Sequence, residues 1–312
     1  MEYVQLGKTD LMVSRICFGC WQLSPAFWGD VAIDPWQDAV RAALDVGVNF
    51  IDTADAYGEG LAESELGQLL AADRLRDRFI VATKFYWRFT NGERFPDTTY
   101  GHIIDACEAS LRRLKTDRID LYQIHAFDPL TRPDDVAAAL LELKRQGKIR
   151  WIGVSNLNPE QMRMYAKNFD VSCLQPPYSA LNRAVEAEEL PYCLSERIGV
   201  IVYSPLFRGL LTGKYKRDHV FTDSRARAPQ FSGEKFHRVL DALDTLRPVA
   251  ETYGLDLAQL AIRWVLTHPA VTSAIVGVKE RRHIEGIVPA VGTPLSGDDW
   301  HRVARVLADA AR

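Results

Sequence analysis

Short apolar segments alternate with amphipathic ones along almost the whole sequence. Eight of the short runs are predicted to be buried strands, because they are apolar throughout and turn residues bound them. They are Ile16–Gly19, Val48–Ile51, Phe79–Thr83, Ile119–Ile124, Ile149–Val154, Cys173–Gln175, Val200–Tyr203 and Thr272–Val276. Segments with helical periodicity separate them. Eight strands in alternation with helices predict an α/β fold, a closed (β/α)8 or TIM barrel rather than an open sheet.

Two further features complete the predicted architecture. An N-terminal β-hairpin is expected, because Val4–Leu6 and Leu11–Val13 flank a turn with Gly and Asp. No linker rich in proline or glycine divides the chain, so residues 1–312 are expected to form a single barrel domain. Residues 207–236 are the one long irregular connection, which is typical of a functional loop, and we expect them to form a lid over a cofactor.

Composition argues against several classes of partner. The 38 Lys and Arg residues nearly balance the 41 Asp and Glu residues, and no basic run occurs, so neither nucleic acid nor a membrane surface is expected as a partner. No secretory leader and no stretch of about 18 apolar residues is found, which predicts a cytoplasmic protein. Cys17 and Cys20 lie within an apolar run, which indicates buried thiols rather than a metal site.

Polar residues follow successive predicted strands, and in a barrel such positions share one mouth. Asp52 and Tyr57 follow the second strand, Lys84 the third and His125 the fourth. Taken singly, each has an ordinary explanation: a strand-end Asp often caps a helix, a lone Tyr is usually packing, a Lys is normally solvated and a His is more often a core residue. The set is more specific, because all four lie at the same end of their strands.

These four residue types suit the reduction of a carbonyl group by hydride. The carbonyl oxygen needs a proton, and Tyr is a poor acid at neutral pH because its reference pKa is about 10. We expect Lys84 to lower the pKa of Tyr57, and Asp52 to hold Lys84 charged and in place. A neutral His125 can donate a hydrogen bond to the substrate oxygen and orient it.

The chain resembles the aldo-keto reductase superfamily nearly from end to end. The matching segments are FGCWQ, NFIDTADAYGEGLAESELG, IVATK, LRRLKTDRIDLYQIH, KIRWIGVSN, YSPLFRGLLTGKY and AIVGVKERRHI. The resemblance implies that Tyr57 is the general acid in reduction and the base in oxidation. It also implies that Lys84 and Asp52 tune Tyr57 and that His125 orients the carbonyl group.

The resemblance further implies an NADP(H) site that is spread over the later strand ends. Ser155, Asn156 and Gln175 would hold the nicotinamide carboxamide, and Tyr203 would stack on the nicotinamide ring. The implied contacts to the phosphates come from Ser204, Leu206, Arg208, Gly209, Gly277 and Lys279. The chain has no GxGxxG after its first strand, so a Rossmann nucleotide site is not expected.

The segment after the eighth strand departs from the family's pattern, which often has a basic residue, a Gln and an Asn there. Lys279 aligns with the basic residue, His283 with the Gln, and Gly286 or Ile287 with the Asn, while Arg281 or Arg282 adds charge. Three cations within four residues favour NADPH over NADH, because a 2′-phosphate adds about two negative charges. The alternative is that these residues form the solvated face of a helix start.

Large aromatic residues after strands one, three and four suggest an apolar pocket for aldehydes or aromatic carbonyl compounds. They are Trp21, Trp28, Tyr86, Trp87 and Phe127, and the alternative for each is ordinary packing at the barrel rim. We therefore predict reversible reduction of a small aldehyde or ketone with NADPH. Two other functions stay open: a sugar or polyol dehydrogenase that runs toward oxidation, and a nucleotide-sensing accessory subunit with slow turnover.

A metal-dependent hydrolase on the same barrel is disfavoured, and no metal is expected. The first strand lacks the paired His residues that such sites use, and Lys84 would repel a cation. The physiological substrate, the favoured direction and the oligomeric state stay open at the level of sequence.

Overall fold

A closed barrel of eight parallel strands forms the centre of the computed structural model, which describes residues 1–90 and 92–311. The barrel strands are β3 (Ile16–Gly19), β4 (Phe50–Asp52), β5 (Ile80–Phe85), β8 (Ile119–Ile124), β9 (Ile149–Ser155), β10 (Cys173–Gln175), β11 (Gly199–Tyr203) and β12 (Ser273–Gly277). They follow one another around the barrel in chain order, and β12 pairs with β3 to close it. The prediction of a TIM barrel is confirmed.

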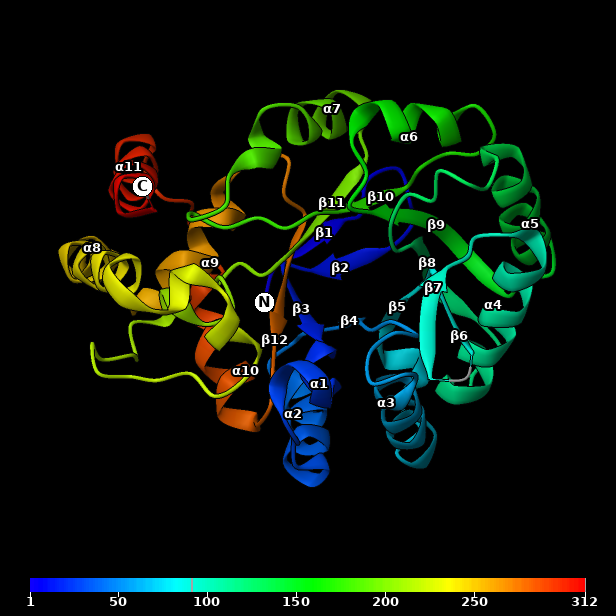
Figure 1. The fold of residues 1–312 in the computed structure, drawn as a ribbon, viewed down its shortest axis with the longest axis horizontal. Coiled ribbons are helices and arrows are strands. Elements are labelled where there is room, and N and C mark those ends of the chain that lie inside the picture. Colours follow the sequence, from blue (N-terminus) through cyan, green and yellow to red (C-terminus); the bar gives the residue numbers. More distant parts are fainter. Residues whose placement is uncertain (91, 312) are drawn as a thin grey trace.

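Helices surround the barrel (Figure 1). They are α1 (Pro25–Trp28), α2 (Ile33–Asp45), α3 (Leu61–Ala72), α4 (Tyr100–Leu114), α5 (Pro133–Arg145), α6 (Pro159–Ala166), α7 (Glu189–Glu196), α8 (Gly233–Thr252), α9 (Leu257–Thr267), α10 (Arg281–Ile287) and α11 (Gly297–Ala311). Local sequence sets where several begin: Asn158 and Asp256 each form a capping box at the start of α6 and α9. The last helix, α11, packs against α8 on one side of the molecule.

Two antiparallel hairpins lie outside the barrel. The predicted N-terminal hairpin is confirmed as β1 (Tyr3–Gln5) paired with β2 (Met12–Ser14). Its loop residue Leu6 is buried in the cluster that fills the barrel interior, so this hairpin covers the end at which the strands begin. The second hairpin, β6 (Trp87–Thr90) and β7 (Glu93–Pro96), follows β5 and was not predicted.

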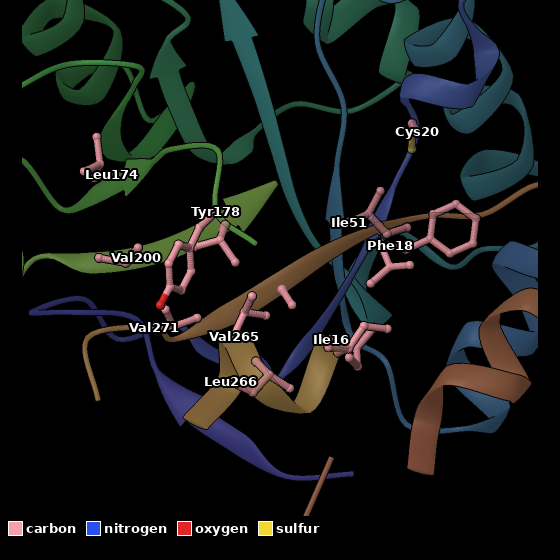
Figure 2. Packing of buried hydrophobic residues seen from close by; sticks show 14 of the residues in the cluster. Ile16, Phe18, Cys20, Ile51, Leu174, Tyr178, Val200, Val265, Leu266 and Val271 are labelled. Carbon is pink, nitrogen blue, oxygen red and sulfur yellow. The ribbon is translucent and has the colours of Figure 1, made fainter. Parts of the chain in front are cut away.

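The apolar core has two layers, which follow from the alternation of side chains along each strand. In β3, Cys17 points into the barrel, whereas Ile16 and Phe18 point outward to the helices. The Phe18 ring meets the Trp36 ring of α2 edge-on, with ring centroids 5.8 Å apart. Figure 2 shows part of this outer layer, with Ile16, Phe18 and Ile51 among its labelled residues. All five cysteines are buried and free, which includes Cys17 and Cys20, the two predicted to be buried thiols.

The connection from 207 to 236 is less irregular than predicted. It contains short 3-10 turns at Leu210–Thr212, Ser224–Arg227 and Pro229–Phe231, and α8 already begins at Gly233. Within the described part of the chain, no helix is long and apolar enough to cross a membrane. Over the same residues, no group of three or more His, Cys, Asp or Glu side chains could hold a metal ion.

Candidate active site

A cavity of about 580 Å³ opens where the barrel strands end, which is where catalytic residues gather in this fold. Its volume lies in the range of about 300–1,000 Å³ that is typical of ligand pockets. Most predicted site residues line it: Trp21, Trp28, Asp52, Tyr57, Trp87, His125, Ser155, Asn156, Gln175, Tyr203, Ser204, Leu206, Arg208, Gly209, Gly277, Lys279 and His283. The topology thus brings together side chains that are far apart in the sequence.

Lys84 lies beneath the cavity and connects two of the other predicted catalytic side chains. Its Nζ donates hydrogen bonds to Asp52 Oδ2 at 2.7 Å, to the Thr53 carbonyl oxygen at 2.9 Å and to Tyr57 Oη at 3.1 Å. All three protons of the ammonium group are therefore used. The Lys84 side chain is fully buried and that of Asp52 is 2% exposed, and such a pair is tolerated because each charge has a partner.

Asp52 is also held from the opposite wall of the barrel. Its Oδ1 accepts a hydrogen bond from Gln175 Nε2 at 2.7 Å and a longer one from Gln123 Nε2 at 3.4 Å. Gln123 was not predicted as a site residue, although a buried-strand glutamine close to the end of β8 was a signal that could have found it. These contacts orient the carboxylate toward Lys84.

The charge states of this group differ in one respect from the prediction. Burial opposes the charge on Lys84, but the Asp52 carboxylate and the Tyr57 phenol outweigh it and raise the pKa of Lys84 above its ordinary value. The predicted influence of Lys84 is present, since its charge and its hydrogen bond lower the pKa of Tyr57, but the net shift is not downward. Burial of the phenol outweighs the attraction of Lys84 and raises the pKa of Tyr57 to about 12. Tyr57 therefore keeps its proton at neutral pH.

His125 stands beside Tyr57, with the two rings nearly perpendicular and their centroids 6.2 Å apart. Burial, together with the charge on Lys84, lowers the pKa of His125 to about 3. The imidazole is therefore neutral, the form in which one nitrogen donates and the other accepts. Its Nδ1 is buried and has no hydrogen-bond partner among the described residues.

Ser155, Asn156 and Tyr203 form a connected polar wall. Tyr203 Oη donates to Asn156 Oδ1 at 2.9 Å, and Asn156 Nδ2 donates to Ser155 Oγ at 3.0 Å and to the His125 carbonyl oxygen at 3.0 Å. Asn156 has a φ of 60°, in the left-handed region that Asn tolerates better than most residues. This wall joins the ends of β8, β9 and β11 to one another.

The far end of the cavity is cationic. The charged groups of Arg208, Arg225 and Lys279 lie 5.8, 5.2 and 5.6 Å from the centre of the Trp28 ring. Arg225 is neutralised by Asp223, which receives hydrogen bonds from it. Arg208 Nε is buried without a hydrogen-bond partner among the described residues, as is expected where an anionic group belongs.

Gly277 brings the backbone close to this end of the cavity. A Cβ atom at this position would lie 1.8 Å from Gln22 Nε2, so a larger residue would have to displace the Gln22 side chain. Gln22 Oε1 is buried and lacks a hydrogen-bond partner among residues 1–90 and 92–311. The cationic end and the unpaired N–H of Arg208 both fit a phosphate-bearing cofactor.

Besides Lys84, which lies beneath the cavity, three predicted site residues are not among those that line it. Tyr86 is buried and donates a hydrogen bond from its hydroxyl group to the Phe127 carbonyl oxygen, while the Phe127 ring packs near Tyr165. Arg282 forms an ion pair with Glu280. These are corrections to the predicted substrate pocket and cofactor site.

The basic residues at 279–282 do not form the predicted cluster at the cavity, because acidic partners elsewhere hold two of them. Arg281 forms ion pairs with Asp38 and Asp45 of α2, so its charge points away from the cavity. Of the three cations only Lys279 lines the cavity. Ile287, rather than Gly286, lines it at the predicted position of the family's Asn.

Several lining residues were not predicted: Phe27, Arg94, Lys214 and Arg225. Lys214 and Arg225 belong to the segment 207–236, and the several basic residues of that segment could have indicated that it contributes to a site for an anionic group. Arg94 lies on β7, in the hairpin that was not predicted.

The chain is similar to known proteins along almost its whole length. The Aldo/keto reductase family model matches residues 15–308. Aldo-keto reductase YhdN of Bacillus subtilis (strain 168) is 36% identical, over 98% of this chain and 94% of that protein. NADH-specific methylglyoxal reductase of Escherichia coli (strain K12) is 34% identical, over 96% of each protein. The solved structure of glycerol dehydrogenase AKR11B4 from Gluconobacter oxydans superposes with a TM-score of 0.90 at 34% identity, over 99% of this chain and 95% of that one.

Proposed function

This chain belongs to the aldo/keto reductase family, and from that premise we propose that it reduces an aldehyde or ketone to an alcohol with NADPH, with Tyr57 as the proton donor. Family membership supports the coarser statement, an NAD(P)-dependent oxidoreductase that acts on carbonyl compounds. One observation carries the finer proposal. Asp52, Lys84 and Tyr57 form a hydrogen-bonded line that ends at the cavity, beside a neutral His125.

NADPH, when bound, supplies the hydride for this reaction. Ser155, Asn156, Gln175 and Tyr203 would hold its nicotinamide end. At the cationic end of the cavity, its phosphates would be held by Ser204, Leu206, Arg208, Gly209, Gly277, Lys279 and His283. The segment 207–236 would act as the lid, because it contributes Arg208 and Arg225 to this end.

Residues of the chain itself would hold the proton and transfer it to the substrate oxygen. Tyr57 keeps its proton at neutral pH and donates it to the substrate oxygen as the alcohol forms. Lys84, fixed in its charged form by Asp52, stabilises the phenolate that remains. His125 donates a hydrogen bond to the carbonyl oxygen and so fixes its position relative to Tyr57.

We expect reduction to be nearly independent of pH between about 6 and 10, because Tyr57 stays protonated and His125 stays neutral over this range. Alcohol oxidation needs the phenolate, so its rate is expected to rise about tenfold per pH unit over the same range. Profiles of kcat/KM against pH in both directions measure this. A fall in reduction with a midpoint near pH 8 would show that the pKa of Tyr57 is not raised.

Replacing Lys279 with Ala is expected to weaken NADPH binding by about tenfold or more, because a charge-assisted contact to the 2′-phosphate is lost. NADH binding should change little. Binding titrations with both cofactors test this, with Arg282→Ala as the matched control, since Arg282 pairs with Glu280 and does not line the cavity. Equal weakening of NADPH and NADH by Lys279→Ala would mean that the 2′-phosphate lies elsewhere, and a preference for NADH would then resemble that of the E. coli relative.

A second candidate is a polyol dehydrogenase that runs toward oxidation, which the likeness to the Gluconobacter oxydans glycerol dehydrogenase favours. Initial rates decide between the candidates: NADPH oxidation with aldehydes and ketones, against NADP+ reduction with glycerol and other polyols at the same pH. Faster turnover of carbonyl compounds supports our proposal. Faster turnover of polyols near neutral pH would replace it with the second candidate.

A further inference from the structure

The β6–β7 hairpin lies on the opposite side of the cavity from the cationic end. It follows β5, and the order of strands around the barrel puts β5 four strands away from β11, across the barrel. Figure 1 shows the hairpin on the opposite side of the molecule from α8 and α10. Two hairpin residues, Trp87 and Arg94, line the cavity.

The register of the hairpin fixes which side chains face the cavity. Phe89 pairs with Arg94, and Trp87 pairs with Pro96. Paired residues share a face, and successive residues alternate between faces, so these four lie on the face that carries Trp87 and Arg94 to the cavity. The Arg94 guanidinium lies over the Trp87 ring, 4.9 Å from the ring centre. This contact orients the planar guanidinium, whose N–H groups can donate paired hydrogen bonds.

Arg94 is exposed on β7 and differs from its neighbour Arg88 in its charge partners. Arg88, on the other face, forms an ion pair with Asp97 at 2.6 Å. Among the described residues, Arg94 has no ion pair with a carboxylate, and Glu93 lies on the opposite face. Among the described residues that line the cavity, the one carboxylate is Asp52, which is bound by Lys84.

We propose that Arg94 binds an anionic group of the substrate, so that the preferred substrates are aldehydes or ketones that carry a carboxylate or a phosphate. This inference rests on the proposed function and deepens it. The planar guanidinium can donate two parallel hydrogen bonds to either group. Trp21, Phe27 and Trp87 would cover the apolar part of the same molecule.

Matched pairs of aldehydes test the inference: succinic semialdehyde against butanal for the carboxylate, and glyceraldehyde 3-phosphate against glyceraldehyde for the phosphate. The measured quantity is the ratio of kcat/KM for the charged member to that for the neutral member. We expect the ratio to exceed one for at least one pair, and to fall about tenfold in Arg94→Gln. Arg94→Lys should retain part of the preference, because it keeps the charge but loses the fork.

Arg88→Gln is the matched control, because it removes a neutralised cation from the other face of the same hairpin. It should leave the ratio at the wild-type value. The pair that shows the preference identifies carboxylate or phosphate as the group. Turnover of neutral and charged aldehydes without preference, or a ratio that Arg94→Gln leaves unchanged, overturns this inference alone. Reduction of none of these aldehydes overturns this inference, and failure with ketones as well overturns the proposed function.

Discussion

Replacing Tyr57 with Phe is expected to lower the turnover number for carbonyl reduction by about a hundredfold to ten-thousandfold, the range that a positioned general acid contributes. The substitution removes the hydroxyl group that accepts a hydrogen bond from Lys84 and that would protonate the substrate oxygen. It leaves the phosphate end of the cavity untouched. NADPH affinity should therefore remain close to that of the wild type.

Steady-state rates and a fluorescence titration with NADPH measure the two effects separately. Tyr86→Phe is the matched control, because Tyr86 loses the same atom but its hydroxyl group bonds to the Phe127 carbonyl oxygen outside the cavity. It should turn over at the wild-type rate. Wild-type turnover by Tyr57→Phe would remove Tyr57 from the mechanism.

Replacing Lys84 with Met is expected to impair both stability and turnover. The Asp52 carboxylate would remain buried without its cation, which is expected to lower the free energy of unfolding by about 3–5 kcal/mol. The same change removes the charge that stabilises the Tyr57 phenolate. Turnover should then fall by about a hundredfold or more, a loss comparable to that of a positioned proton-transfer group.

A double substitution separates the two effects. Lys84→Met combined with Asp52→Asn removes both charges, so it should recover much of the lost stability but none of the lost turnover. Denaturant unfolding gives the free energies, and steady-state kinetics gives the rates. A single Lys84→Met variant with wild-type stability and wild-type rates would contradict the structural account of this group.

The barrel could be predicted because each strand is an apolar run that turn residues end. The predicted bounds of β3, β8 and β10 agree with the structure residue for residue. The β6–β7 hairpin could not be predicted in the same way. Its strands mix aromatic and charged residues and stand outside the barrel, so they carry neither an apolar run nor a clear alternation.

That Asp52, Tyr57, Lys84 and His125 come together could be predicted, because the topology brings all strand ends to one mouth. The direction of individual side chains was not visible in the sequence. Tyr86 and Trp87 are neighbours in an extended stretch, where successive side chains point to opposite sides, so only Trp87 reaches the cavity. Arg281 follows Lys279 by two residues and turns toward α2, where Asp38 holds it.

The sequence also did not show how charge and burial together set the pKa of Tyr57. The residue types indicated that Lys84 acts on Tyr57, and the hydrogen bond between them agrees with this. No sequence motif showed how deeply the Tyr57 phenol is buried. Burial is the larger influence, and it is why the pKa of Tyr57 is raised rather than lowered.

The most direct test of NADPH-dependent carbonyl reduction follows NADPH and product together in one reaction. The purified protein is mixed with NADPH and a panel of aldehydes, ketones and sugars, and NADPH and NADH binding are measured in parallel. Our account predicts tight NADPH binding and one alcohol formed for each NADPH oxidised, with one carbonyl class turned over fastest. Tight binding of NADPH with no turnover in either direction would contradict it and favour a nucleotide-sensing subunit.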